Sequence, residues 1–184
     1  MYKSPITHYP TVLEQLINDN SVEVPSVENI ENSTNEESYL LQFDGSAVPN
    51  PGRASGGAVL FSPRRGEIFE PDAVKYIEVG EYISHATNNI AEYTGLIIGL
   101  ELALEVGVRN LIVEGDSMLV VQQVQGKWKV SAEPLKPYCA RAKELLGKFD
   151  SVVVRHIRRE KNSHADSLTN EVVAKRVGFK RGSL

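Results

Sequence analysis

The sequence predicts an α/β domain with a five-stranded mixed sheet and helices on its faces. Three apolar, partly alternating runs follow one another between residues 39 and 83 with short connections, which indicates an antiparallel meander. Helical stripes then alternate with two continuous apolar runs, the pattern of strands covered on both faces. The predicted order of elements is therefore βββαβα(α)βα.

The meander accounts for the first three strands. We expect strands at Tyr39–Asp44, Gly57–Phe61 and Lys75–Ile83. The segment Pro49-Asn50-Pro51-Gly52 is typical of a turn and connects the first two.

A long helix is predicted next, from Asn88 to about Val106. The pair Asn88-Asn89 can cap its start, and Gly107 can end it. An apolar stripe runs along it through Ile90, Ile97, Leu100 and Leu104.

Two strands and three helices complete the domain. They are a strand at Leu111–Val113, a helix at Met118–Val124 behind Ser117, a helix at Leu135–Leu146, a strand at Ser151–Ile157, and a helix that begins at about His164 behind Ser163.

The charge distribution divides the chain of 184 residues, which carries a net charge of −4. Residues 1–38 hold one basic and seven acidic residues, so the remainder holds 19 basic and 17 acidic ones. We expect an acidic extension over 1–37 with a short helix at Thr11–Ile17, a folded domain over 38–175, and a basic tail over 176–184. The acidic pI therefore does not exclude a polyanionic partner.

Other classes of protein are disfavoured. The single cysteine, Cys139, excludes an internal disulfide, and the N-terminus lacks the apolar run of a secretory signal. No stretch approaches the ~20 apolar residues of a membrane span. We expect an intracellular monomer, in the cytoplasm or the nucleus or nucleoid, with no membrane partner and no organic cofactor.

Four acidic residues stand where ligand sites gather in such a sheet. Asp44 and Asp116 follow predicted strands, and Glu92 and Asp166 lie in the first turns of predicted helices. Each position alone suits turn chemistry or the helix dipole. Brought together, four carboxylates repel one another unless a cation neutralises them. Oxygen ligands without a His/Cys set favour Mg²⁺ or Mn²⁺ over zinc.

Four segments carry these acids: FDGSAVPNPGRASGGAVLF, TNNIAEYTGLIIGLELAL, LIVEGDSMLVVQQVQGKWKV and VVVRHIRREKNSHADSL. In this order and spacing the chain, from about Tyr39 to Val173, resembles type 1 ribonuclease H, most closely its plant-like and archaeal branch. The resemblance implies a ribonuclease H-like fold. It also implies metal-dependent endonucleolytic cleavage of the RNA strand of RNA–DNA hybrids, with 5′-phosphate and 3′-hydroxyl products.

The resemblance further implies two Mg²⁺ ions, with Mn²⁺ as a substitute. Asp44 would bridge both ions, Glu92 and Asp116 would complete one site, and Asp166 would complete the other. In such centres one ion lowers the pKa of the attacking water. The second ion, roughly 4 Å from the first, stabilises the leaving oxygen.

The same resemblance assigns substrate contacts to Asn50, Thr87, Asn88 and Asn89. The small residues Gly45 and Ser46, next to Asp44, are expected to contact the substrate at close range. A hybrid is distinguished from DNA by 2′-hydroxyl groups in a wide, shallow minor groove, which small residues allow to approach closely. Turn and cap chemistry would explain the same residues, and the two interpretations are compatible.

The segment Gly126-Lys127-Trp128-Lys129 is a second candidate contact. An aromatic residue between two lysines suits stacking on a sugar and binding of phosphates. The alternative is that Trp128 belongs to the core. Many bacterial relatives carry a longer basic insertion here, so we expect a modest and strongly salt-dependent affinity for hybrids.

Two basic residues compete for a catalytic role before Asp166. Arg159 matches the loop position of the plant-like and archaeal pattern, and His156, at the end of a predicted strand, is the alternative.

Three further residues receive minor assignments. Asn162 matches a position that supports the last acid and contacts substrate. His164 is predicted to face solvent, and Met118 replaces a polar substrate contact of bacterial relatives.

Two other functions stay open. One is a non-catalytic module that binds hybrids or duplexes, which the four clustered acids disfavour because binding gains nothing from negative charge beside phosphates. The other is a related nuclease that acts on DNA or double-stranded RNA. The acidic extension either solubilises the protein or mimics nucleic acid, and the first is favoured.

Overall fold

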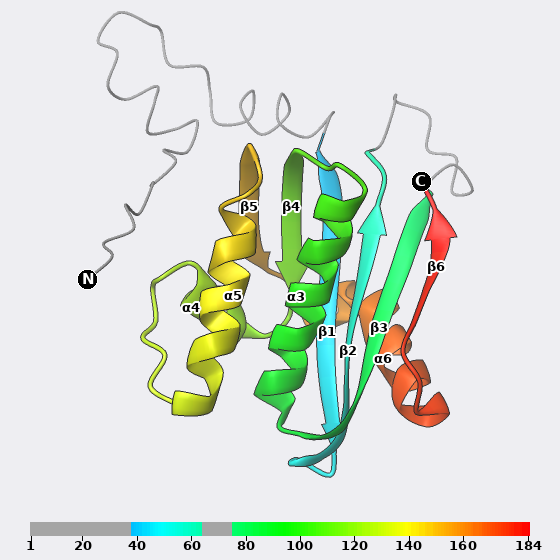
Figure 1. Ribbon diagram of the computed structural model, residues 1–184, viewed down its shortest axis with the longest axis vertical. Coiled ribbons are helices and arrows are strands. Elements are labelled where there is room, and N and C mark those ends of the chain that lie inside the picture. Colours follow the sequence, from blue (N-terminus) through cyan, green and yellow to red (C-terminus); the bar gives the residue numbers. More distant parts are fainter. Residues whose placement is uncertain (1–37, 64–74) are drawn as a thin grey trace, which may run out of the picture. The chain divides into compact units, whose positions relative to one another are not determined.

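Six strands form one mixed sheet in the computed structural model, which describes residues 38–63 and 75–184. Their order across the sheet is β5-β4-β1-β2-β3-β6 (Figure 1). The strands are β1 Tyr39–Val48, β2 Gly52–Phe61, β3 Tyr76–Ala86, β4 Asn110–Gly115, β5 Ser151–His156 and β6 Phe179–Ser183. β2, β3 and β6 continue from β1 in antiparallel pairs, and β4 and β5 add in parallel on its other side. The predicted mixed α/β sheet is confirmed.

The sequence predicted five strands, and the sheet has a sixth. Phe179–Ser183, which was expected to lie in a basic tail, forms β6 against the edge strand β3. Four of its five residues are exposed, so it carries no alternating apolar pattern that the sequence could reveal. Basic residues on an edge strand also discourage pairing with other chains.

The helices follow the predicted order. They are α3 Asn88–Glu105, α4 Met118–Val124, α5 Lys136–Leu146 and α6 Ser163–Lys175, with short 3-10 turns η2 at Glu133–Leu135 and η3 at Arg159–Lys161. The cap of α3 is Thr87, whose hydroxyl accepts the N–H of Ile90 at 3.3 Å, one residue before the predicted pair. Ser117 caps α4 as predicted. None of the helices in the described ranges is long and apolar enough to span a membrane.

The helices cover the sheet unequally. α3, α4 and α5 pack on one face, and α6 lies on the other (Figure 1). The main core forms on the first face, around Leu41, Phe43 and Leu60 of the sheet and Tyr93 and Leu96 of α3. A smaller cluster of Val59, Ala165 and Leu168 holds α6. The predicted extension over 1–37, with its possible helix, lies outside the described residues.

β1 is longer than predicted. It continues through the FDGSAV segment to Val48, so Asp44 lies in the middle of the strand, opposite Gly57 of β2, and not at its end. β4 ends at Gly115, which pairs with Phe43, so β1 runs on beyond its parallel neighbour. The N–H of Ala47 on this stretch is bound by the side-chain oxygen of Asn88, at 2.7 Å. The edge of β1 beyond β4 is therefore open to side chains from α3.

Candidate active site

Close packing at Gly45 brings α3 onto β1. A Cβ atom at this position would lie 2.0 Å from the backbone nitrogen of Glu92 and 2.1 Å from the carbonyl carbon of Ala91. Only glycine permits that approach. As a result Glu92 lies beside Asp44, although it is the fifth residue of α3 and so lies beyond the first turn in which it was predicted.

Three carboxylates converge at the open edge of β1. Asp44, Glu92 and Asp116 each offer an oxygen, and these oxygens all lie within 4.8 Å of one another. The parallel register explains part of this arrangement, because Asp44 and Asp116 are the residues that follow the last β1–β4 pair, Phe43 with Gly115. The donor set contains only oxygen, which suits a hard divalent cation.

The electrostatics of the cluster fit a bound cation. Burial raises the pKa of Asp44 to about 6, and the charges of Asp116 and Asp166 add to the effect. The pKa of Glu92 is also raised well above its ordinary value, first by burial and then by Asp44 and Asp116. Among the described residues, buried Oε2 of Glu92 has no hydrogen-bond partner. A cation between the carboxylates would relieve both the repulsion and this unsatisfied oxygen.

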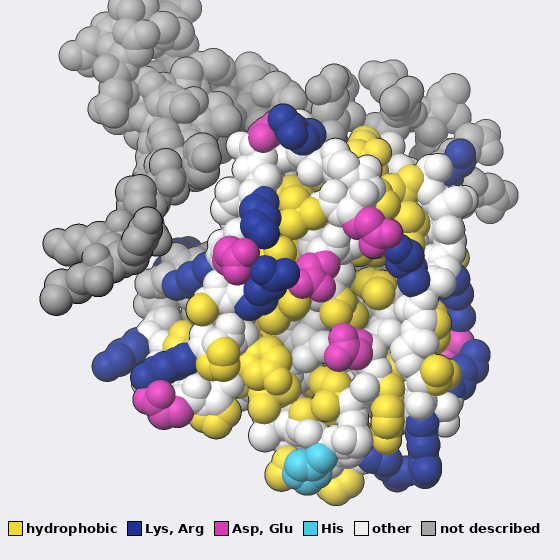
Figure 2. Space-filling view, in the orientation of Figure 1, with side chains coloured by type: hydrophobic (Ala, Val, Ile, Leu, Met, Phe, Trp, Pro, Cys, Tyr) yellow, Lys and Arg dark blue, Asp and Glu magenta, His cyan; other side chains and the backbone are white. Residues whose placement is uncertain are grey.

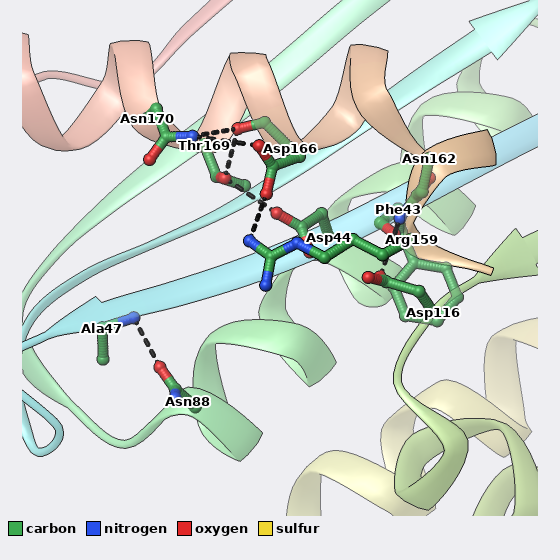
Figure 3. A network of polar contacts seen from close by, with 10 residues as sticks. All are labelled: Phe43, Asp44, Ala47, Asn88, Asp116, Arg159, Asn162, Asp166, Thr169 and Asn170. Carbon is green, nitrogen blue, oxygen red and sulfur yellow. Dashed lines mark hydrogen bonds and ion pairs between the residues drawn. The ribbon is translucent and has the colours of Figure 1, made fainter.

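The fourth acid, Asp166, lies beside this cluster. It stands in the first turn of α6, as predicted. Arg159 extends past Asp44 and donates to Oδ1 of Asp166 at 2.6 Å, and the Asn170 amide donates to Oδ2 at 3.2 Å (Figure 3). The rival basic residue, His156, stays in β5, with Nε2 3.2 Å from the carbonyl oxygen of Asp116. Of the two, Arg159 is the one that reaches a carboxylate.

Asn162 links β1 to Asp116, the residue that follows β4. Its side chain is buried and donates to Oδ1 of Asp116 at 2.9 Å and to the carbonyl oxygen of Phe43 at 2.8 Å (Figure 3). The supported acid is therefore Asp116 and not Asp166, the one expected from the sequence.

The predicted substrate residues near α3 have structural partners. The side-chain oxygen of Asn50 accepts the backbone N–H of Asn88 at 3.1 Å, and the oxygen of Asn88 binds Ala47. Together with the Thr87 cap, these bonds tie the β1–β2 turn to the start of α3. Ser46 and Asn89 are half-buried nearby. The side-chain oxygens of Asn50 and Asn88 therefore accept hydrogen bonds within the protein, and their NH₂ groups are the parts that a ligand could contact.

The segment after α4 lies on the surface. Trp128 is 50% exposed, which excludes the core alternative, and Lys127 and Lys129 beside it are exposed. Gly126, with a φ of 76°, turns the chain out of α4. Met118 at the start of that helix is exposed as well.

The prediction that His164 faces solvent is wrong. Its Nε2 lies 2.6 Å from Oε1 of Glu78, and its ring packs edge-on against Phe61 and Tyr76. Strand β3 supplies this partner from far along the sequence, so no local pattern indicates it.

Thr169 is a site residue that the sequence analysis missed. Its hydroxyl lies 2.8 Å from Oδ2 of Asp44 (Figure 3). The spacing of three residues from Asp166 places it on the same side of α6, and this spacing is the one signal that could have found it.

Comparison with known proteins places the chain in a family. Residues 42–172 match the Reverse transcriptase-like domain family. The crystal structure of RNase H1 from the halophilic archaeon Halobacterium salinarum NRC-1 is 38% identical in sequence, with a TM-score of 0.66, and the match covers 75% of this chain and 98% of that one. This chain is a type 1 ribonuclease H family member.

Two further comparisons with ribonucleases H are informative. The curated Ribonuclease HI of Halobacterium salinarum is 40% identical over 131 residues, which cover 71% of this chain but only 62% of that protein. LC11-RNase H1, solved in complex with an RNA/DNA hybrid, is 34% identical with a TM-score of 0.64, and the match covers 76% of this chain and 99% of that one.

Proposed function

We propose that this protein hydrolyses the RNA strand of RNA–DNA hybrids endonucleolytically, leaving 5′-phosphate and 3′-hydroxyl ends. The observation that carries the proposal is the convergence of Asp44, Glu92 and Asp116, with oxygens within 4.8 Å of one another. The family supports it, because the similar LC11-RNase H1 was crystallised with a hybrid.

The carboxylates would hold two divalent ions, Mg²⁺ or Mn²⁺. Asp44, Glu92 and Asp116 would bind the first, and Asp44 with Asp166 the second. When bound, such ions acidify the attacking water and stabilise the leaving oxygen. The chain itself contributes the rigid placement of Asp44 on β1, and the Asn162 bond that orients Asp116.

Arg159 would assist catalysis through its positive charge beside Asp166. Its guanidinium remains charged at any physiological pH and binds Asp166 directly at 2.6 Å. Arg159→Ala should therefore lower the rate of hydrolysis more than His156→Ala. The reverse order would assign the role to His156.

The substrate would contact the edge of the protein where these acids meet. Gly45 and Ser46 allow close approach, and the NH₂ groups of Asn50 and Asn88 would donate to the nucleic acid, with Thr87 and Asn89 beside them. Lys127 and Trp128 would bind one strand through phosphate and sugar. Lys127→Ala should reduce the slope of log affinity against log salt by about 1.

The decisive experiment measures cleavage of a hybrid with labelled RNA in the presence and absence of Mg²⁺. We expect Mg²⁺-dependent cleavage that Asp116→Asn abolishes. Cleavage undiminished in that variant, or hybrid binding without any cleavage, contradicts the proposal. DNA duplex and double-stranded RNA at the same salt concentration test whether hybrids are preferred.

A further inference from the structure

Helix α6 presents a hydroxyl group to the central carboxylate of the site. Thr169 is fully buried, and its Oγ1 lies 2.8 Å from Oδ2 of Asp44, a residue 125 positions away in the sequence (Figure 3). The carboxylate it contacts is one of the three, Asp44, Glu92 and Asp116, that could together hold a metal ion.

The surroundings of Thr169 fix the direction of its hydroxyl. Its methyl group lies over Gly57, the β2 residue paired with Asp44, so closely that a Cβ at Gly57 would be 3.0 Å from it. The buried hydroxyl of Ser55, also on β2, donates to the carbonyl oxygen of Thr169 at 2.8 Å. A β-branched side chain has few χ1 orientations, and packing of the methyl group against β2 selects one.

The hydroxyl has one proton and two acceptors within reach. Oδ2 of Asp44 and the carbonyl oxygen of Asp166 are both 2.8 Å away. The carbonyl also receives the side-chain amide of Asn170, at 2.9 Å. A hydrogen bond to a charged acceptor is the stronger of the two, so the proton goes to Asp44.

We propose that Thr169 is a positioning residue that holds the Asp44 carboxylate in the plane required for binding divalent cations. One oxygen of Asp44 is held by the hydroxyl, which fixes the rotation of the carboxylate and hence the direction of both oxygens. The inference rests on the proposed function, in which Asp44 binds both ions. Without the hydroxyl the carboxylate can rotate, and part of the binding free energy is lost in ordering it.

The test compares variants of the full chain by calorimetric titration with Mn²⁺ and with Mg²⁺, without nucleic acid. Thr169→Val keeps the methyl group and the size of the side chain but removes the hydroxyl, and we expect about tenfold weaker cation binding. Thr169→Ser restores the hydroxyl and should bind within a few-fold of wild type. Ser167→Ala, an exposed change on the same helix, is the control and should bind as wild type does.

Unfolding in EDTA checks that the variants remain folded. If Thr169→Val does not fold, Thr169→Ala takes its place with the same expectation. Cation affinity equal to wild type in the variant without a hydroxyl overturns the proposal. It is equally overturned if Thr169→Ser binds as weakly as Thr169→Val.

Hydrolysis of the hybrid provides a second, separable readout. Thr169→Val should lower kcat at limiting Mg²⁺ and leave KM for the hybrid unchanged. At high Mg²⁺ the kcat of the variant should return to the wild-type value. If the wild-type protein binds cations but cleaves no hybrid, the proposed function fails and the titrations still decide the role of Thr169. If the wild type cleaves and Thr169→Val needs no more Mg²⁺, the positioning role alone fails.

Discussion

Asp44 shows how much of the site depends on one residue and its immediate packing. It is only 5% exposed, lies in β1 opposite Gly57 of β2, and accepts a hydrogen bond from Thr169 of α6. Two other carboxylates, Glu92 and Asp116, share its surroundings. Burial of this charge without a cation costs free energy, which appears as the rise in the pKa of Asp44 to about 6. Without metal, the arrangement that favours cation binding therefore weakens the fold.

Replacing Asp44 by Asn should remove this cost. The pKa rises from 3.8 to about 6 on folding, so the folded state binds the proton more tightly, and wild-type stability falls as pH rises from 4 through 6. In EDTA at pH 8, Asp44→Asn should thus be more stable by up to about 3 kcal/mol. The difference should shrink toward pH 4.

Urea unfolding at several pH values measures this difference. Adding Mg²⁺ should stabilise the wild type and leave Asp44→Asn unchanged, because only the wild type binds the ion in the folded state. Identical pH dependence in the two proteins would contradict the burial argument.

Gly45 is required because helix α3 packs directly against its backbone. In Gly45→Ala the new methyl group would meet the α3 backbone at 2.0 Å. We expect a loss of about 2–3 kcal/mol in the free energy of unfolding, and weaker cation binding because Glu92 is displaced. Gly147→Ala is the matched control, since its Cβ would meet the nearest atom at an ordinary 3.5 Å. Equal stability of the two variants in urea would refute the claim.

At the scale of elements, ion pairs from strand β6 connect helix α6 to the sheet. Arg181 of β6 binds Glu78 of β3 and, at 2.7 Å, Glu171 of α6. Burial favours a higher pKa for Glu78, but hydrogen bonds from Arg181 and His164 outweigh it and hold the pKa below its ordinary value. The C-terminal segment that resembles a tail in the sequence therefore fastens the helix that carries Asp166.

Arg181→Met should accordingly lower the melting temperature, because Glu78 loses a partner inside the protein. Lys180→Met is the control. Lys180, also in β6, forms an ion pair with Glu105 at 2.6 Å, but the side chains of both residues are exposed. Such surface pairs contribute little, so the control should melt close to wild type. Calorimetry that finds equal shifts for both variants would show that β6 does not anchor α6 through this residue.

At the scale of the whole molecule, one face of the described part carries charges of both signs. On the face that carries α3 and α5, acidic and basic side chains are interspersed (Figure 2). Arg141 bridges Glu101 and Glu144 there, at 2.7 and 3.0 Å. Such a mixture does not attract a polyanion, whereas cations bound at the open edge of β1 would.

The acidic segment 1–37 can be tested at this scale. A protein that begins at residue 38 should bind hybrid as tightly as the full chain at matched salt, if the segment only improves solubility. Fluorescence anisotropy at low and high salt measures this affinity. Tighter binding after the deletion, lost at high salt, would instead support mimicry of nucleic acid by the segment.

Sequence patterns predicted well where the information is local. Ser117 as a helix cap, Asp116 after β4 and Asp166 in the first turn of α6 all follow from short motifs. Asp44 was placed at a strand end because the small residues after it resemble a turn. In the fold those residues continue β1, since β2 pairs with them as far as Val48. Pairing with the neighbouring strand β2 outweighed the local turn propensity of these residues.

The sequence by itself determined the α/β class, the order of the helices and the four acids that we propose as metal ligands, because periodicity, caps and motifs are properties of neighbouring residues. Only the tertiary structure decided that three acids form one cluster with Asp166 beside it. It also revealed that β6 fastens α6 and that Thr169 holds Asp44. These contacts join residues up to 125 positions apart. Their geometry depends on strand register and on glycines that allow close packing, which no local pattern encodes.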